Sequence, residues 1–575
     1  MRLPARWFWL IALTALSIVK TGYCYFCDNH ATQLPLVLRS HNPELFPGDP
    51  FLDALSGYMG WIWWLIAKLS EFVSIEIVFV VLFLLTRALL IYGTARLASD
   101  LVPESKTAPF LAALLMALGP YPILGDGTLV EVYWEQSGMF MPLFVLCLAL
   151  LLEDKPVRFF LLLGVAYLIN PLYGSWSLVF FAATYLADPG RGSWRRFAAA
   201  APVFFILAAP ILLRGAGVLS EPAVDLDLWM WVNRLLISPH AFPETWPSVQ
   251  FRHFFLFSGL VLLAGLLFRG IGSRLWRLTV IWTILAWIFL ALAFPAAAGV
   301  SRTLLIFQPA RAAELFYLAG GVTAAGVGAY LAEKWRGGVG FLALVLIFSS
   351  LAYLLVPEFR EHVAPTAIIA GGILACGLLL ADWKSAAAKR WFPVVGCLWL
   401  GLVVSLTIWA SLGARVERDG GIAQAMYRGP DPAVQELADW ARISTPIDSV
   451  FFHDPITWKW AQFRYLAQRP VFTTWKDASA VLWDPSFAGE WSRRFAAYGF
   501  RGKWRDRWDL SQPGEVRRVR RSLVWRYQDL SDEDLDAMSQ EYRIDFWIAP
   551  IATLTKFPAV HTSGNFKVLD LRERS

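Results

Sequence analysis

Residues 77–92 read IVFVVLFLLTRALLIY, an apolar run in which Arg87 is the single charged side chain. Similar runs recur through the first 412 residues of the 575-residue chain, which is 57% hydrophobic and 17% charged, with a mean hydropathy of +0.49. A soluble protein of this length would not carry so much apolar surface, whereas helices that cross a bilayer require it. The sequence therefore predicts an α-helical polytopic membrane protein.

The apolar segments of membrane-spanning character number about thirteen, and several are shorter than the ~20 residues of a straight span. Basic residues gather in alternate loops, which are expected to face the cytoplasm, so the first long loop and the C-terminus are expected on the opposite side. The pair at 157–169 and 172–186 could instead form a re-entrant hairpin, which leaves the side of the C-terminus unchanged. The predicted spans are residues 7–19, 77–92, 109–124, 137–152, 157–169, 172–186, 197–213, 254–268, 278–294, 312–331, 339–356, 365–381 and 391–412.

Residues 413–575 differ from the rest, because they are charged and contain no apolar run long enough to span a bilayer. Strand-like and helix-like segments alternate there, which predicts a soluble periplasmic α/β domain. Residues 1–412 form the expected transmembrane domain, with a long first outer loop at 23–75. Within this loop residues 51–71 are expected to form an amphipathic helix in the interface plane, the alternative being the end of another membrane helix. In the tail we expect strands at 449–452, 470–474, 544–548 and 566–569, and helices at 459–466 and 532–542, the last with Ser531 as its N-cap.

The charge and the cysteine content further narrow the class of protein and the kinds of site it can contain. The net charge of +6 is explained by basic cytoplasmic loops and by affinity for anionic lipid headgroups, and we find no nucleic-acid motif. Cys24 and Cys27 form a Cys-x-x-Cys pair that cannot complete a zinc site alone, which favours a local disulfide or two packed thiols. A basic tract over 493–521 could bind an anionic glycan or a lipid phosphate, or could simply be a solvated surface.

Polar residues in three outer loops are the candidates for a functional site. Carboxylates there could deprotonate a hydroxyl or bind a divalent cation, and arginines could neutralise a phosphate. The competing interpretation is that the carboxylates are solvated and the arginines meet headgroups. Arg87 and Glu314 lie in or near apolar spans, where charge is expensive, so they either have a function or snorkel to an interface. The candidate catalytic residues are Asp28 and His30, and the candidate substrate-binding residues are Asp126, Glu131, Glu135, Arg302 and Arg311.

The layout of residues 1–412 resembles the GT-C superfamily of polytopic membrane glycosyltransferases: a short start, one helix, then a long outer loop with an early acidic residue. Residues 28–50 and the segment Gln308–Arg311 look like bacterial GT-C-like membrane proteins. The resemblance implies an inverting glycosyltransferase of the bacterial inner membrane that moves a sugar from a polyprenyl-phosphate donor to a lipid, glycan or protein acceptor. It also implies an acidic catalytic residue at Asp28. Asn29 and His30 follow where paired-acid members would have a second carboxylate, so a divalent cation is compatible with the site but not required by it.

Two other functions compete with this hypothesis. A lipid or glycan transporter or flippase should show internal repeats and polar residues along several membrane helices, and we find few such residues and no clear repeat. A non-catalytic envelope scaffold would use the outer tail and the basic tract but would not need Asp28. We therefore prefer the transferase.

Overall fold

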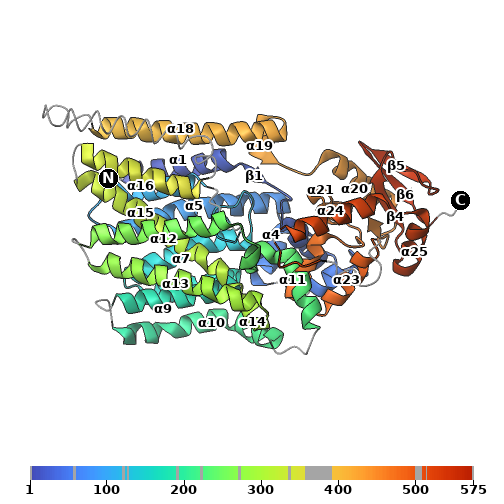
Figure 1. Ribbon diagram of the computed structural model, residues 1–575, viewed down its shortest axis with the longest axis horizontal. Helices are drawn as coiled ribbons and strands as arrows, with labels where there is room; N and C mark the ends of the chain where they lie inside the picture. The colour runs from blue at the N-terminus through green and yellow to red at the C-terminus, as the bar shows by residue number, and fades with distance from the viewer. Residues whose placement is uncertain are drawn as a thin grey trace. The chain divides into compact units, whose positions relative to one another are not determined.

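The computed structural model describes residues 3–55, 58, 60–119, 123–125, 128–188, 193–219, 225–269, 273–334, 338–356, 392–498, 508–512 and 514–572. The chain is mostly helical, with a small sheet near its C-terminus (Figure 1). It divides into two compact units, neither of which is continuous in sequence. The first contains residues 1–23, 79–213 and 246–428, and the second contains residues 24–78, 214–245 and 429–575. The second unit thus joins most of the predicted outer loop and a central segment to the tail.

The first unit is a set of apolar helices that run side by side (Figure 1). Six described helices are long and apolar enough to cross a membrane, over 75–101, 194–213, 248–268, 274–297, 302–334 and 397–419. Each predicted span with described residues contains a helix, but the helix in the span predicted over 109–124 ends at Ala117, and residues 365–381 lie outside the described part. The helices are α1 (Leu3–Thr21), α5 (Ile75–Leu101), α6 (Ala108–Ala117), α7 (Gln136–Leu152), α8 (Pro156–Ile169), α9 (Pro171–Ala187), α10 (Trp194–Leu219), α12 (Ser248–Phe268), α13 (Ser273–Ala297), α14 (Arg302–Phe307), the 3₁₀ helix η3 (Pro309–Ala312), α15 (Ala313–Lys334), α16 (Gly338–Leu355), α18 (Phe392–Asp419) and α19 (Ile422–Met426), with two short strands, β1 (Tyr23–Cys24) and β2 (Tyr427–Arg428).

Helix α15 packs against α6, α12, α13 and α16 and is buried along almost its whole length. Its many small residues allow neighbouring helices to approach closely, as in other membrane bundles. A Cβ atom at Gly320 would lie 2.8 Å from Val261 of α12, and one at Gly328 would lie 3.0 Å from Ile347 of α16. The glycines therefore set the distance between α15 and its neighbours.

The second unit combines helices with a four-stranded sheet of order β3-β4-β6-β5. The β3–β4 pair is parallel, and the other two pairs are antiparallel. Ser531 is the N-cap of α25, as predicted, and forms a capping box with Asp534. The elements are α2 (His30–His41), α3 (Pro50–Ala54), α4 (Trp61–Ser70), α11 (Leu226–Ala241), η2 (Pro243–Thr245), α20 (Pro432–Ser444), β3 (Phe451–Phe452), α21 (Trp458–Ala461), α22 (Phe463–Ala467), η6 (Trp475–Leu482), α23 (Phe487–Ala496), α24 (Glu515–Gln528), α25 (Asp532–Tyr542), β4 (Phe546–Pro550), β5 (Ala559–Ser563) and β6 (Phe566–Asp570).

Three local predictions in the second unit are wrong. The single helix expected over 459–466 is two short helices, α21 and α22, with Gln462 between them. The single helix expected over 51–71 is two helices, α3 and α4, because Gly60 adopts an extended conformation and starts α4 anew. The strand expected over 470–474 contributes one isolated bridge, between Val471 and Phe451. Pro470 has no N–H to donate, and the Val471 N–H donates to the Asp49 carboxylate at 3.3 Å instead of to a neighbouring strand.

Candidate functional site

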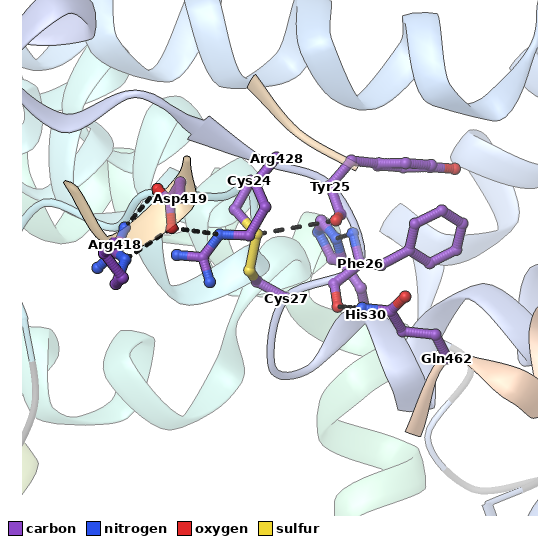
Figure 2. Close-up of a disulfide and its surroundings, with 9 residues drawn as sticks. All are labelled: Cys24, Tyr25, Phe26, Cys27, His30, Arg418, Asp419, Arg428 and Gln462. Atoms are coloured by element: carbon purple, nitrogen blue, oxygen red, sulfur yellow. Dashed lines mark hydrogen bonds and ion pairs between the residues drawn. A yellow bond between two sulfur atoms is a disulfide. The ribbon is translucent and has the colours of Figure 1, made fainter. Parts of the chain in front are cut away.

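The first candidate site is a tight turn closed by a disulfide between Cys24 and Cys27, whose Cα atoms are 5.8 Å apart (Figure 2). Phe26 and Asp28 both have left-handed backbones, with φ of +69° and +44°. Residues with a Cβ rarely adopt this conformation, so the surroundings must hold the turn in place. The disulfide is one such constraint.

His30 supplies a second constraint on the turn. Its Nδ1 accepts the backbone N–H of Phe26 at 3.0 Å, which places the ring proton of the neutral imidazole on Nε2 (Figure 2). The ring is fully buried and contacts the edge of Tyr25. Gln462 donates to the Phe26 carbonyl at 3.4 Å from the other side. In this position His30 supports the turn that presents Asp28.

The Asp28 carboxylate accepts a hydrogen bond from the Lys476 ammonium at 2.6 Å. The Asp28 side chain is 45% exposed, and an ion pair at such a site contributes only about 0–1 kcal/mol to folding. The pair therefore costs little to open. A ligand phosphate could take Lys476 and leave the carboxylate on its fixed turn.

Asp477, the residue after Lys476, belongs to a buried triad with Arg464 and Asp49. Arg464 is only 3% exposed and donates to both Asp477 oxygens, at 3.0 and 2.8 Å, and to Asp49 at 2.8 Å. Asp477 also forms a capping box with Thr474 on η6, and Asp49 caps α3. Each carboxylate therefore fixes a helix start as well as the guanidinium. Because Lys476 is the neighbour of Asp477 in η6, the triad holds the backbone that carries the partner of Asp28.

Burial controls the electrostatics of the triad. It raises the pKa of the Asp49 carboxyl, with Asp477 adding to the rise and Arg464 opposing it. For Arg464, burial would lower the pKa, but the carboxylates of Asp477 and Asp49 outweigh it and the net shift is upward. The guanidinium therefore stays charged and pairs with both buried acids.

The first unit contains a separate charged cluster around Arg311. Its guanidinium lies 5.2 Å from the ring centre of buried Tyr173, and its Nε is 3.6 Å from the Glu314 carboxylate. Glu135 interacts electrostatically with both Arg311 and Glu314. Gln308, in a left-handed conformation with φ of +44°, turns the chain between α14 and η3, the 3₁₀ helix that carries Arg311. The structure thus brings together two predicted residues, Glu135 and Arg311, with Glu314, which the sequence indicated only as an unusual charge.

Other predicted residues have different surroundings. The Glu131 carbonyl accepts a hydrogen bond from Arg87, which is buried and also donates to Thr21 at 3.3 Å. Arg87 therefore connects two helices and a loop rather than snorkelling. Arg302 is the first residue of α14, one helix before Arg311. Asp126 lies outside the described residues.

No metal-binding constellation is found in the described part of the chain, where no group of three or more His, Cys, Asp or Glu side chains could hold an ion. Lys476, Arg464 and Asp477 were not predicted as site residues. The Asp49-Pro50 dipeptide and the Thr474-x-x-Asp477 spacing are capping signatures that could have drawn attention to both acids. Their shared partner could not be found this way, because Arg464 and Asp49 are 415 positions apart.

Residues 432–498 match a family model described as a domain of unknown function, DUF6798. No curated protein matches the chain. The matched segment runs from the start of α20 to the residues after α23 and contains Arg464, Lys476 and Asp477. Over this part of its second unit, which includes the lysine partner of Asp28 and two members of the triad, the chain is similar to that family.

Proposed function

We propose that this protein is a polytopic membrane glycosyltransferase of the GT-C type, with about thirteen spans and an extracytoplasmic second unit. In this proposal it transfers a sugar from a polyprenyl-phosphate donor to a glycan, lipid or protein acceptor. The observation that carries the proposal is the Asp28 carboxylate, half-exposed and paired with Lys476 on a constrained turn. The Cys24–Cys27 disulfide supports an extracytoplasmic position for this turn, because disulfides persist in oxidising compartments.

The proposed reaction is a single displacement with inversion. The acceptor hydroxyl oxygen attacks the anomeric carbon, the bond from that carbon to the phosphate oxygen breaks, and the phosphate leaves with the electron pair. Asp28 takes the hydroxyl proton. Lys476 neutralises phosphate charge, and its transfer from Asp28 to the phosphate frees the base when the donor binds. Arg311, expected to bind phosphate, is held by Glu314 and Tyr173 within the first unit.

The test is turnover by the purified full chain in lipid nanodiscs, supplied with a panel of polyprenyl-phosphate sugars and membrane extract as acceptor. Asp28→Asn should reduce the release of polyprenyl phosphate by about 10²–10⁴-fold, the usual contribution of a positioned base. Asp53→Asn is the matched control, because Asp53 is also half-exposed and paired with one cation, Arg39, at 2.5 Å. Wild-type turnover in Asp28→Asn, or equal loss in both variants, would remove Asp28 from the reaction.

A further inference from the structure

The second unit has a cavity of about 350 Å³ that belongs to neither site described above. Helix α24, the turn that follows it and the first turn of α25 provide most of its walls, and Tyr498, two residues after the end of α23, borders it. Small-molecule sites usually measure ~300–1,000 Å³, so this volume suits a ligand of one or two rings. The lining residues are Tyr498, Ser522, Trp525, Arg526, Asp529, Leu530 and Asp534.

The exposed ring of Trp525 gives the cavity an apolar face. Trp525 is 63% exposed, although an indole of this size is usually covered in a folded protein. Tyr498 is fully buried, and its hydroxyl donates to the Thr473 carbonyl at 3.1 Å, so this residue supports the cavity from beneath and is not a contact for a ligand. The faces of aromatic rings are electron-rich and attract polarised C–H groups, such as those on one face of a pyranose.

The polar groups of the cavity match hydroxyls better than anions. Asp529 and Asp534 provide acceptors, and Arg526 provides donors. Asp534 is already oriented, because it accepts from the Ser531 backbone N–H at 3.2 Å and from its hydroxyl at 3.0 Å. Among the lining residues two carboxylates outnumber one guanidinium, so the lining itself suits a neutral ligand better than a phosphate or a carboxylate. A neutral polyol can donate to the acids and accept from the arginine.

We propose that this cavity binds the pyranose ring of a neutral saccharide, which stacks on Trp525 and forms hydrogen bonds to Asp529, Asp534 and Arg526. Binding at the cavity goes beyond the proposed transfer reaction and does not depend on it. Only one further step rests on the proposed function, namely that the bound saccharide is part of a glycan acceptor. The other arginines of α24 do not line the cavity, so they take no part in the proposed binding.

The experiment is saturation-transfer NMR on the full chain in lipid nanodiscs, because glucoside and maltoside detergents would compete. The probes are methyl β-D-glucopyranoside, methyl β-D-galactopyranoside and, as the anionic counterpart, methyl β-D-glucuronide. We expect transfer to the ring protons of at least one neutral glycoside and about tenfold weaker binding in Trp525→Ala. Trp64→Ala is the matched control, because Trp64 is 55% exposed in the same unit and does not line the cavity.

Three results would overturn the proposal: no transfer to either neutral glycoside, equal binding by Trp525→Ala and wild type, or a glucuronide signal as strong as the neutral one. Asp28→Asn separates this inference from the proposed function. It should retain saccharide binding whether or not it retains turnover. If Asp28→Asn loses turnover but still binds the saccharide, both proposals are supported. If the protein has turnover but binds no saccharide, only the proposal of saccharide binding at the cavity is overturned.

Discussion

Replacing Arg464 by Met tests whether the buried triad holds the second unit together. The substitution leaves Asp49 and Asp477 buried without their cation, at 0% and 3% side-chain exposure. Removing one partner of a buried ion pair costs about 3–5 kcal/mol, most of it the penalty of the charge left behind. At roughly 2–4 °C per kcal/mol for a unit of this size, the apparent Tm should fall by about 10 °C.

The measurement is thermal unfolding of the full chain in nanodiscs, followed by protease sensitivity of the second unit. Arg39→Met is the control, because Arg39 forms a single ion pair at a site where the pair contributes under ~1 kcal/mol. The triple variant Asp49→Asn, Arg464→Met, Asp477→Asn should recover most of the loss, since it removes all three charges and keeps an acceptor at each helix cap. If Arg464→Met unfolds at the temperature of the Arg39→Met control, the triad is not what stabilises this unit.

Three further predictions concern stability. Burial lowers the pKa of His453 to about 4, so below pH ~6.5 the unfolded chain takes up a proton that the folded chain does not. The free energy of unfolding should therefore fall by about 3 kcal/mol from pH 6.5 to 4. Urea unfolding of wild type and His453→Gln checks this, because the difference between their stabilities should follow that slope. Cys27→Ser should destabilise the chain by about 2 kcal/mol through the short loop it opens, whereas Cys397→Ser, at an exposed free cysteine, should leave the Tm unchanged; equal Tm values would contradict a stabilising disulfide. Gly320→Ala should lower the Tm, because its Cβ would meet Val261 at 2.8 Å, whereas Gly401→Ala, with nothing within 4 Å of its Cβ, should raise the Tm slightly. A Tm change of the same sign in both variants would refute the close packing of α15 on α12.

Helices were the most predictable part of the fold, because each produces its own local signal. The apolar run at 77–92 lies inside α5, and the Ser531 cap marks the start of α25. The extended backbone at Gly60 interrupted a pattern whose apolar spacing continued past it, so one helix was predicted where two exist. Spacing records which residues are apolar, not where the chain bends between them.

The candidate sites were less predictable, because their geometry depends on distant partners. Asp28 was identified from its place in a loop, but its pairing with Lys476 joins residues 448 positions apart. His30 was predicted to be catalytic from its chemistry alone, and its burial and its bond to Phe26 could not be read from composition. Glu314 was conspicuous as a charge near an apolar run, yet Tyr173, which shares its cluster, had no signal of its own.

The near-complete enclosure of α15 bears on how the chain is assembled. The segment 302–334, which contains α15, has a mean hydropathy of 1.5 over its most apolar window, the lowest among the six long apolar segments, and the others range from 1.8 to 2.4. A segment so rich in glycine and alanine, with Glu314 at its start, has little preference for lipid and gains its stability from protein neighbours. If the first unit is inserted into a bilayer, α15 should enter late or as a pair with α12 or α16. In a nascent chain truncated just after residue 334, α15 would then be inserted in the bilayer less stably than in a chain that continues through α16.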